Sequence, residues 1–254
     1  MNHFKKRVKQ NTNILQGKVI ICTYPKTGQD ELAEMLTAQG ASVFSMPVIE
    51  ISPLPFQLQT DLSDYDWLIF TSKNAVEPFT NRYPSISCKV AALGEKTAIH
   101  LRKYKVDPAF IGSGKSAVDF ATQFIDVVQA NENILLVLGN LAPDTLKQQL
   151  GSKASIDRIN AYQTCSSEQL DPRFMEWVEH DRYDLLLVTS PSSVRAILEK
   201  VSKSADQLRF VSIGTTTTAA IRKYGGEPVA TSEEPSYEGM AQTIIDYYQA
   251  KIKN

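Results

Sequence analysis

The sequence predicts an α/β protein with parallel β-sheets, because short apolar runs alternate with amphipathic helical segments and because this order occurs twice. The apolar runs are too short for helices, and turn or helix-start residues bound them, which favours strands. Strands that alternate with helices are typical of parallel sheets covered by helices on both faces. The expected strands are residues 18–22, 42–51, 66–70, 90–93, 108–111, 133–138, 155–164, 184–188, 210–213 and 227–231.

The segments between these strands carry apolar residues at helical spacing. In residues 28–40, Leu32, Met35 and Leu36 fall on one side of a helix, and Gly40 marks its end. Hydrophobic residues make up 43% of the chain and charged residues 22%, which is the composition of a globular protein that can bury a full core.

The order of the segments repeats because the sequence contains an internal duplication. Residues 65–76 (YDWLIFTSKNAV) match residues 183–194 (YDLLLVTSPSSV), an offset of 183 − 65 = 118. Residues 92–110 match residues 212–230, an offset of 212 − 92 = 120, and 28–43 match 142–156 more weakly. A unit of this length is too long for a solenoid repeat. The sequence therefore predicts a duplicated α/β domain of flavodoxin-like size.

Charge and cysteine content exclude several classes of protein. Lys and Arg number 27 against 28 Asp and Glu, a net charge of -1 that argues against broad nucleic-acid or membrane-surface binding. The three cysteines show neither disulfide nor zinc spacing, and no pair of histidines has metal-ligand spacing. No apolar stretch approaches the roughly 20 residues of a membrane span, and no signal-peptide core follows the basic N-terminus. We expect a cytoplasmic protein without a metal site, with residues 1–16 as a flexible tail.

Hydroxyl and glycine residues follow the strands of both halves. Residues 71–72 and 189–190 are both Thr-Ser, and Gly94 and Gly214 follow the next strand in each half. Ligands of open parallel sheets bind beyond the carboxyl ends of the strands, where helix N-termini present free N–H groups to carboxylates or phosphates. The same residues could instead serve only as helix caps.

Motifs of other enzyme classes are absent or incomplete. Residues 112–116 (GSGKS) are similar to the end of a phosphate-binding loop, but the first glycine of that motif would fall at Ala109. The chain contains neither a dinucleotide fingerprint nor a nucleophile elbow. The sequence therefore favours a cleft lined by hydroxyls and backbone amides, with few obligatory catalytic side chains.

Six segments in a fixed order resemble the uroporphyrinogen-III synthase family, and the resemblance covers about residues 17–247. The segments are residues 70–76, 92–98, 159–164, 188–194, 212–221 and 235–240. This resemblance implies two flavodoxin-like domains with parallel sheets, joined by a two-strand linker near residues 47–52 and 160–165. It also implies that one domain is discontinuous: domain 1 comprises residues 17–47 plus 166–254, and domain 2 comprises residues 52–160.

The resemblance implies an enzyme of heme biosynthesis, a lyase that cyclises hydroxymethylbilane with inversion of ring D and loss of water. It implies no cofactor, and a partner that is a small linear tetrapyrrole carrying eight carboxylates, with neither nucleic acid nor membrane. We expect a monomer. Two alternatives remain open: a catalytically weakened paralogue that binds a tetrapyrrole or another polyanion, and a two-lobed solute receptor, which would require export.

Site residues follow from the same resemblance. Tyr162 matches the family tyrosine proposed to assist departure of the substrate hydroxyl, although it could also serve only to anchor the linker. The chain departs from the family at Tyr24 and Pro143, where members often carry arginine, so that Lys115 and other lysines would have to contribute. The candidate substrate-binding residues are Ser72, Lys73, Gly94, Lys96, Thr97, Ser116, Ser190, Gly214, Thr217 and Ser236.

Overall fold

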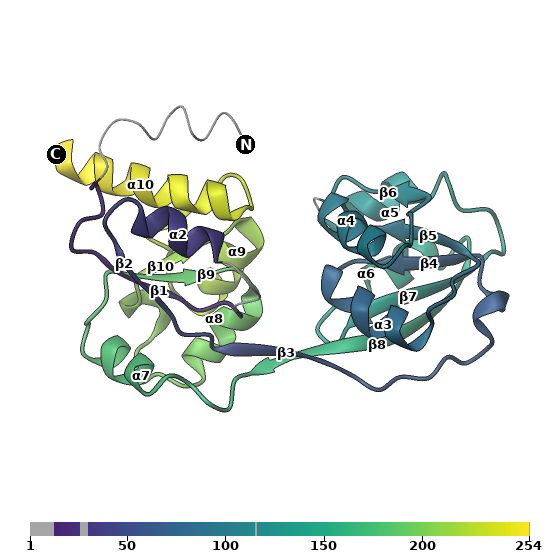
Figure 1. Cartoon of the computed structure of the whole chain (residues 1–254), viewed down its shortest axis with the longest axis horizontal. Helices are drawn as coiled ribbons and strands as arrows, with labels where there is room; N and C mark the ends of the chain where they lie inside the picture. The colour runs from purple at the N-terminus through teal and green to yellow at the C-terminus, as the bar shows by residue number, and fades with distance from the viewer. Residues whose placement is uncertain (1–12, 26–29, 115, 254) are drawn as a thin grey trace. The chain divides into compact units, whose positions relative to one another are not determined.

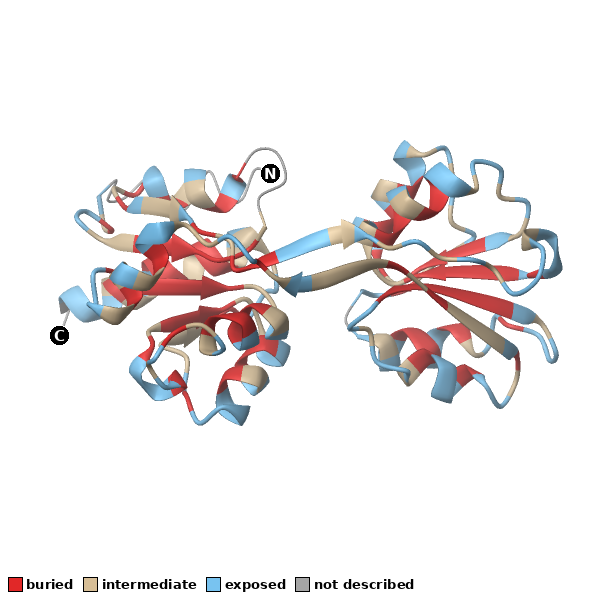
Figure 2. Cartoon of the chain, turned by 90° about the horizontal axis from the view of Figure 1, so that it is seen from below, coloured by how far each residue is buried: buried red, intermediate tan, exposed pale blue. Residues whose placement is uncertain are grey.

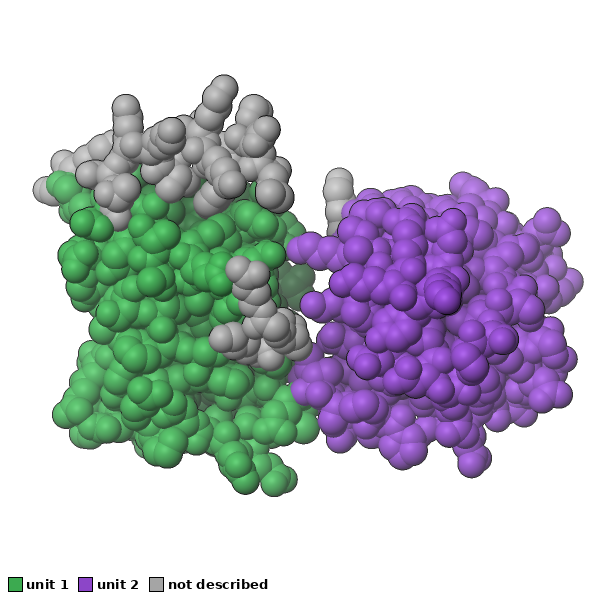
Figure 3. Space-filling view, in the orientation of Figure 1, with its two compact units in different colours: residues 1–50, 165–254 green, residues 51–164 purple. Residues whose placement is uncertain are grey.

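The computed structural model describes residues 13–25, 30–114 and 116–253, and its helices and strands are labelled in Figure 1. The chain divides into two compact units: unit 1 is residues 1–50 plus 165–254, and unit 2 is residues 51–164 (Figure 3). Each unit contains one sheet with helices packed on both of its faces. The fold is therefore α/β with parallel sheets.

The sheet of unit 1 has the strand order β11-β10-β9-β1-β2, and all of its neighbouring pairs are parallel. Numbered along the chain, this order is 2-1-3-4-5, which is found in doubly wound flavodoxin-like sheets. The strands are β1 (Val19–Cys22), β2 (Ser42–Ser45), β9 (Leu185–Val188), β10 (Phe210–Ser212) and β11 (Ala230–Thr231). The helices are α2 (Glu31–Thr37), α7 (Pro172–Glu179), α8 (Pro191–Leu198), α9 (Thr215–Lys223) and α10 (Tyr237–Lys253), with a 3-10 turn, η3 (Ala205–Gln207).

Consecutive strand residues of unit 1 enter two separate cores. Ile20 and Leu187 pack with α2 and α10, whereas their chain neighbours Ile21 and Leu186 pack with α7 and α8 on the other face. This follows from the two-residue period of a strand, which sends successive side chains to opposite faces. The central strands are buried on both faces (Figure 2), and they are therefore continuous runs of hydrophobic residues.

The sheet of unit 2 has the order β3-β8-β7-β4-β5-β6, in which the five strands β4 to β8 pair in parallel. The strands are β3 (Ile49–Pro53), β4 (Trp67–Phe70), β5 (Lys89–Ala92), β6 (Phe110–Ile111), β7 (Asn133–Gly139) and β8 (Ser155–Ser166). The helices are α3 (Val76–Arg82), α4 (Glu95–Lys103), α5 (Ala117–Phe124) and α6 (Thr145–Leu150), with 3-10 turns η1 (Leu62–Asp64) and η2 (Lys73–Ala75).

The duplicated sequence corresponds to a duplicated sheet. The order β8-β7-β4-β5-β6 of unit 2 matches β2-β1-β9-β10-β11 of unit 1, strand for strand. The sequence repeats align β4 with β9 and β5 with β10, in agreement with this match. The two units differ in chain order, because the strand–helix–strand segment that begins unit 1 ends unit 2.

Residues 42–51 form two strands, whereas the sequence predicted one. β2 ends at Ser45 and β3 begins at Ile49, and Pro47 between them has no N–H group to continue a ladder. β3 lies beside β8, where the Leu54 N–H donates to the Ala161 carbonyl at 3.0 Å and the Ser167 N–H donates to the Val48 carbonyl at 2.9 Å. The chain passes between the two units within these strands, at residues 50–51 and 164–165.

The predicted tail of residues 1–16 is too long at its C-terminal end. Residues 1–12 lie outside the described residues. Leu15, however, is fully buried in the core beneath α2 and α10, and its N–H donates to the Gln39 carbonyl at 2.9 Å. Residues 13–16 therefore belong to unit 1, because the apolar Leu15 side chain contributes to its core. None of the described helices combines the length and the apolar character that a membrane crossing requires.

Candidate functional site

Ser190 and Ser72 both act as helix caps, at the carboxyl ends of β9 and β4. The Ser190 hydroxyl accepts the Ser193 N–H at 3.2 Å at the start of α8. The Ser72 hydroxyl accepts the Asn74 N–H at 3.2 Å, and it opens the short turn η2 before α3 begins. The repeated Thr-Ser pair thus has the capping role that the sequence offered as one alternative.

Two further candidate serines cap helices as well. The Ser116 hydroxyl accepts the Asp119 N–H at 3.0 Å and donates to the Asp119 carboxylate at 2.6 Å, at the start of α5. The Ser236 hydroxyl accepts the Gly239 N–H at 2.9 Å, at the start of α10. The hydrogen bonds of helix starts therefore account for all four candidate serines.

The helices after β5 and β10 begin differently, because glycine occupies their cap positions. Gly94 and Gly214 precede α4 and α9, and neither helix has a side-chain capping bond. The Thr97 and Thr217 N–H groups donate to these glycine carbonyls at 3.0 and 3.1 Å. The first two N–H groups of each helix have no intrahelical acceptor and could bind an anion.

Thr97 and Thr217 occupy equivalent places in these two helices. These residues are 6% and 3% exposed, and neither hydroxyl forms a hydrogen bond within the described residues. The adjacent Thr218 differs, since its hydroxyl is bonded to Ser212 and Thr231 at 2.6 and 2.7 Å. Helix capping therefore explains the candidate serines but leaves the hydroxyls of Thr97 and Thr217 without a structural partner.

The candidate lysines lie on the surface. Lys73 and Lys96 are exposed, at the starts of η2 and α4, and neither forms an ion pair within the described part of the chain. Lys115, the third lysine that the sequence suggested, lies outside the described residues. Gly94 lies close to the turn that precedes this lysine, since a Cβ on Gly94 would be 2.6 Å from the Gly114 Cα.

Tyr162 lies in β8 beside the end of β7 and is half-buried against the core that α3 and α4 cover. Its hydroxyl forms no hydrogen bond with the described residues. The phenol is therefore packed along its ring and unpaired at its oxygen. Such a group can anchor a strand through its ring, and its O–H remains free to donate.

Tyr24, at one position where family members often carry arginine, is buried. Its hydroxyl donates to Asp30 Oδ1 at 2.7 Å, and its ring stacks on Tyr237 with a centroid separation of 5.2 Å. Burial raises the pKa of Tyr24, and the neighbouring Cys22 and Asp30 raise it further. Asp30 also caps α2 by accepting the Ala33 N–H at 3.1 Å. A neutral tyrosine, bonded internally to Asp30, therefore occupies this position.

Pro143 is exposed in the turn before α6, and an arginine that the sequence analysis missed lies beside that turn. Arg158 of β8 donates to Asp144 at 2.6 Å and to the Gly139 carbonyl at 3.2 Å. It also donates to the Asn160 side chain. No signal in the sequence marks this cluster, because only the pairing of β7 with β8 brings its members together.

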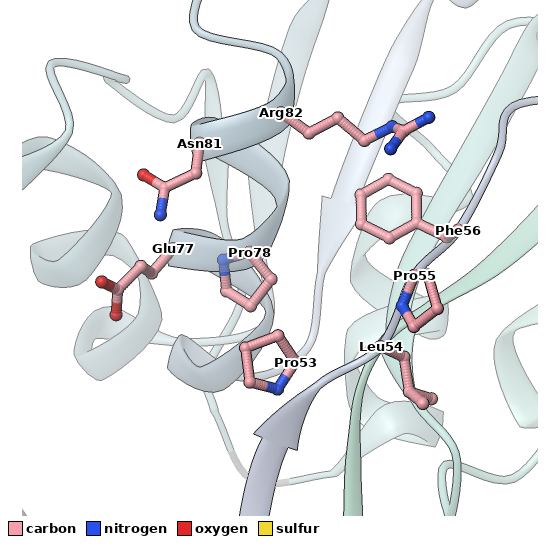
Figure 4. Close-up of a pocket in the computed structure, with 8 residues that line it drawn as sticks. All are labelled: Pro53, Leu54, Pro55, Phe56, Glu77, Pro78, Asn81 and Arg82. Atoms are coloured by element: carbon pink, nitrogen blue, oxygen red, sulfur yellow. The ribbon is translucent and has the colours of Figure 1, made fainter.

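Pockets in both units lie away from the candidate residues. One of about 540 Å³ in unit 2 is lined by residues of the 53–56 and 77–82 segments, where the Arg82 guanidinium lies 5.6 Å above the Phe56 ring (Figure 4). Another of about 450 Å³ in unit 1 is lined by residues that include Lys18, Asp184 and Tyr248. No cluster of three or more His, Cys, Asp or Glu side chains suited to a metal ion occurs in the described ranges.

Several proteins are similar to this chain in sequence over most of its length. A putative uroporphyrinogen-III synthase of Methanocaldococcus jannaschii is 25% identical over 238 residues, which cover 89% of this chain and 97% of that protein. The uroporphyrinogen-III synthase of Synechococcus elongatus is 24% identical over 251 residues, with 91% and 95% covered. The porphyrin biosynthesis protein HemD of Ruminiclostridium josui is 24% identical, and this chain spans about half of its length, 49%.

Solved structures show the same fold. A uroporphyrinogen-III synthetase from Helicobacter pylori has a TM-score of 0.63 at 18% identity, with 89% of this chain and 97% of that chain covered. A mutant uroporphyrinogen III synthase from Thermus thermophilus has a TM-score of 0.60 at 15% identity, with 93% and 100% covered. A family model described as uroporphyrinogen-III synthase HemD matches residues 30–242. Because that match spans well over half of the chain, the chain belongs to the uroporphyrinogen-III synthase family, whose members are cyclising lyases of porphyrin biosynthesis.

Proposed function

We propose that this chain closes hydroxymethylbilane into uroporphyrinogen III, with inversion of ring D and loss of water, as a cytoplasmic monomer. In this proposal the two units are flavodoxin-like domains, and β3 with β8 forms the two-strand linker. One observation carries the proposal: the unpartnered Thr97 and Thr217 hydroxyls occur at equivalent uncapped helix starts in both halves of a chain that matches the family. Neither hydroxyl serves as a helix cap.

The substrate's carboxylates are the groups that these helix starts would bind. Burying eight charged groups in a closed pocket would be very costly, so recognition by several partly open anion sites suits this ligand. The free N–H groups of α4 and α9 and the positive ends of their dipoles favour a carboxylate. The Thr97 and Thr217 hydroxyls each add one donor, and the exposed Lys73 and Lys96 add charge at the surface. Ser72, Ser116, Ser190 and Ser236 would contribute mainly by fixing the helix starts.

The chemical step that needs help from the protein is loss of the substrate hydroxyl. We assign its proton donor as Tyr162, whose O–H has no acceptor within the described residues. The carbon–oxygen bond breaks as the phenol proton moves to the departing oxygen, which leaves as water. The electron-poor methylene-pyrrolenine is then attacked by the substituted carbon of ring D. The resulting spiro intermediate fragments and recloses with the ring inverted. The proton lost from the product restores the phenol. The protein supplies the rest of the selectivity by holding the linear substrate in one reactive conformation.

The test is the isomer ratio of the cyclised product. Purified protein should convert hydroxymethylbilane to the type III isomer without added metal or nucleotide, and the isomers are separated by chromatography after oxidation. The free substrate closes without inversion, so product that is entirely type I would overturn the proposal.

A second candidate is a binding paralogue with weakened activity, favoured by the loss of arginine at Tyr24 and Pro143. It would bind a linear tetrapyrrole tightly, as measured by calorimetry, and hydroxymethylbilane would still close to the type I isomer in its presence. The same chromatogram therefore separates the two functions.

A further inference from the structure

The phenol ring of Tyr162 lies directly against the backbone of Gly139, the last residue of β7. A Cβ atom added to Gly139 would stand 2.7 Å from both Oη and Cε2 of Tyr162. Carbon atoms do not approach other heavy atoms so closely without displacement. Gly139 has no positive φ that would itself demand glycine. The close approach of the ring is therefore what requires glycine at this position.

An irregularity in the β7–β8 pairing directs the Tyr162 ring to this place. Leu138 pairs with Asn160, but the next residue, Gly139, pairs with Tyr162, so Ala161 is the extra residue of a bulge. A regular strand would send Tyr162 and Ala161 to opposite faces. Instead, Tyr162 packs against the same core as Ala161 and Ile159. Bulges commonly re-aim a side chain in this way beside functional sites.

Hydrogen bonds hold both sides of this contact in place. The Asn140 N–H donates to the Tyr162 carbonyl at 3.1 Å, and the Asn140 side chain accepts the Thr164 N–H at 2.9 Å. Arg158 donates to the Gly139 carbonyl at 3.2 Å. The turn cannot move away from the ring without breaking these bonds, so a larger residue at position 139 must displace the ring.

We infer that Gly139 and Asn140 are positioning residues that fix the phenol of Tyr162 for the reaction. This inference rests on the proposed function, in which the Tyr162 O–H assists loss of the substrate hydroxyl. Gly139 allows the ring to lie on the strand end, and Asn140 holds the β8 backbone at Tyr162 and Thr164. Neither residue needs to contact substrate for this role.

The test is a double-mutant cycle between Gly139→Ala and Tyr162→Phe, read in kcat for the type III product. Each single variant should lower kcat about ten- to hundredfold, because each removes the correctly placed phenolic O–H. In the Tyr162→Phe background, Gly139→Ala should change kcat less than about twofold, since the hydroxyl is already absent. Thermal midpoints of all four proteins are measured alongside. A purely structural effect of the alanine would persist in both backgrounds.

Gly226→Ala is the matched control. Gly226 is a buried glycine of unit 1, where an added Cβ would meet the Ala205 carbonyl oxygen at 2.7 Å. This variant should lower the thermal midpoint and leave kcat unchanged. If Gly139→Ala does not fold, Asn140→Ala takes its place in the cycle, with a smaller loss of kcat that also disappears in the Tyr162→Phe background.

The outcomes distinguish a failure of this inference from a failure of the proposed function on which it rests. If the wild-type chain forms no type III product, the proposed function fails. If type III product forms and Tyr162→Phe lowers kcat, but Gly139→Ala has wild-type kcat or multiplies the loss of Tyr162→Phe, the positioning role is overturned and the proposed function stands.

Discussion

Replacement of Thr97 and Thr217 by valine tests whether these two hydroxyls bind substrate or only occupy space. Valine keeps the branched shape of threonine and replaces the hydroxyl with a methyl group. Neither hydroxyl has a hydrogen-bond partner within the described residues, so no intramolecular bond is lost. We therefore expect the free energy of unfolding to stay within about 0.5 kcal/mol of wild type, or to rise slightly.

The effect on catalysis should be much larger if the hydroxyls donate to carboxylates. A hydrogen bond to a charged group contributes about 1.5–3 kcal/mol. Since about 1.4 kcal/mol corresponds to one decade, each single variant should lower kcat/KM about ten- to hundredfold. Initial rates of type III formation over a range of hydroxymethylbilane concentrations give this ratio, and thermal melts on the same samples give the stability.

Thr218→Val is the internal control, because Thr218 is adjacent to Thr217 and is also buried. Its hydroxyl is bonded to Ser212 and Thr231, so its loss should cost about 1–3 kcal/mol of stability and leave kcat/KM unchanged. The reasoning is refuted if Thr97→Val and Thr217→Val both retain kcat/KM within about twofold of wild type. Neither residue would then be a candidate for substrate binding, whatever the melting temperatures of the two variants.

Four other predictions concern the tyrosines and cysteines. Tyr162→Phe should lower kcat by about one to two decades with nearly unchanged melting, and wild-type turnover would reduce Tyr162 to a strand anchor. Tyr24→Phe should cost about 1–3 kcal/mol in a urea titration, because Asp30 loses a buried donor; an unchanged midpoint would contradict the importance of that bond. Burial raises the pKa of the Cys22 thiol from 9.0 to about 12, so at pH 8 iodoacetamide should label the exposed Cys165 and reach Cys22 only after unfolding. The thiol of the unfolded chain ionises at a lower pH than the buried thiol. The free energy of unfolding should therefore be unaffected by Cys22 below pH 9 and should fall as the pH rises from 9 to 12, as thermal melts in that range would show.

The sequence predicted the central strands well, because their residues are apolar on both faces. Leu185–Val188 and the apolar part of Asn133–Gly139 could hardly be anything but buried parallel strands. The edge strands were predicted too long: β6 and β11 contain two residues each, whereas 108–111 and 227–231 were expected. An edge strand pairs on one side only, so fewer of its residues join the ladder.

The candidate site depended more on contacts between distant residues. The helix-start pattern offered capping as one interpretation of Ser72 and Ser190, because a cap is a local feature, but it did not predict the capping bonds of Ser116 and Ser236. The state of the Thr97 hydroxyl was not predictable, since the absence of a partner is a property of the folded neighbourhood. The contact of Tyr162 with Gly139 was missed for a related reason. The two residues are 162 − 139 = 23 positions apart, and only a bulge in the β7–β8 register brings them together.

The altered chain order of the duplicated sheet has a consequence for how the protein is made. Unit 2, residues 51–164, is continuous, so its strands, apart from the last two residues of β8, have been synthesised before residue 165. β1 can pair with β9 only after β9 has been synthesised, since Ile20 pairs with Leu185 across 185 − 20 = 165 positions. Until then its apolar residues lack one neighbouring strand, and the loop that must close contains an entire domain. Synthesis from the N-terminus therefore favours a fixed order of folding, in which unit 2 folds first on the ribosome and the sheet of unit 1 is completed afterwards.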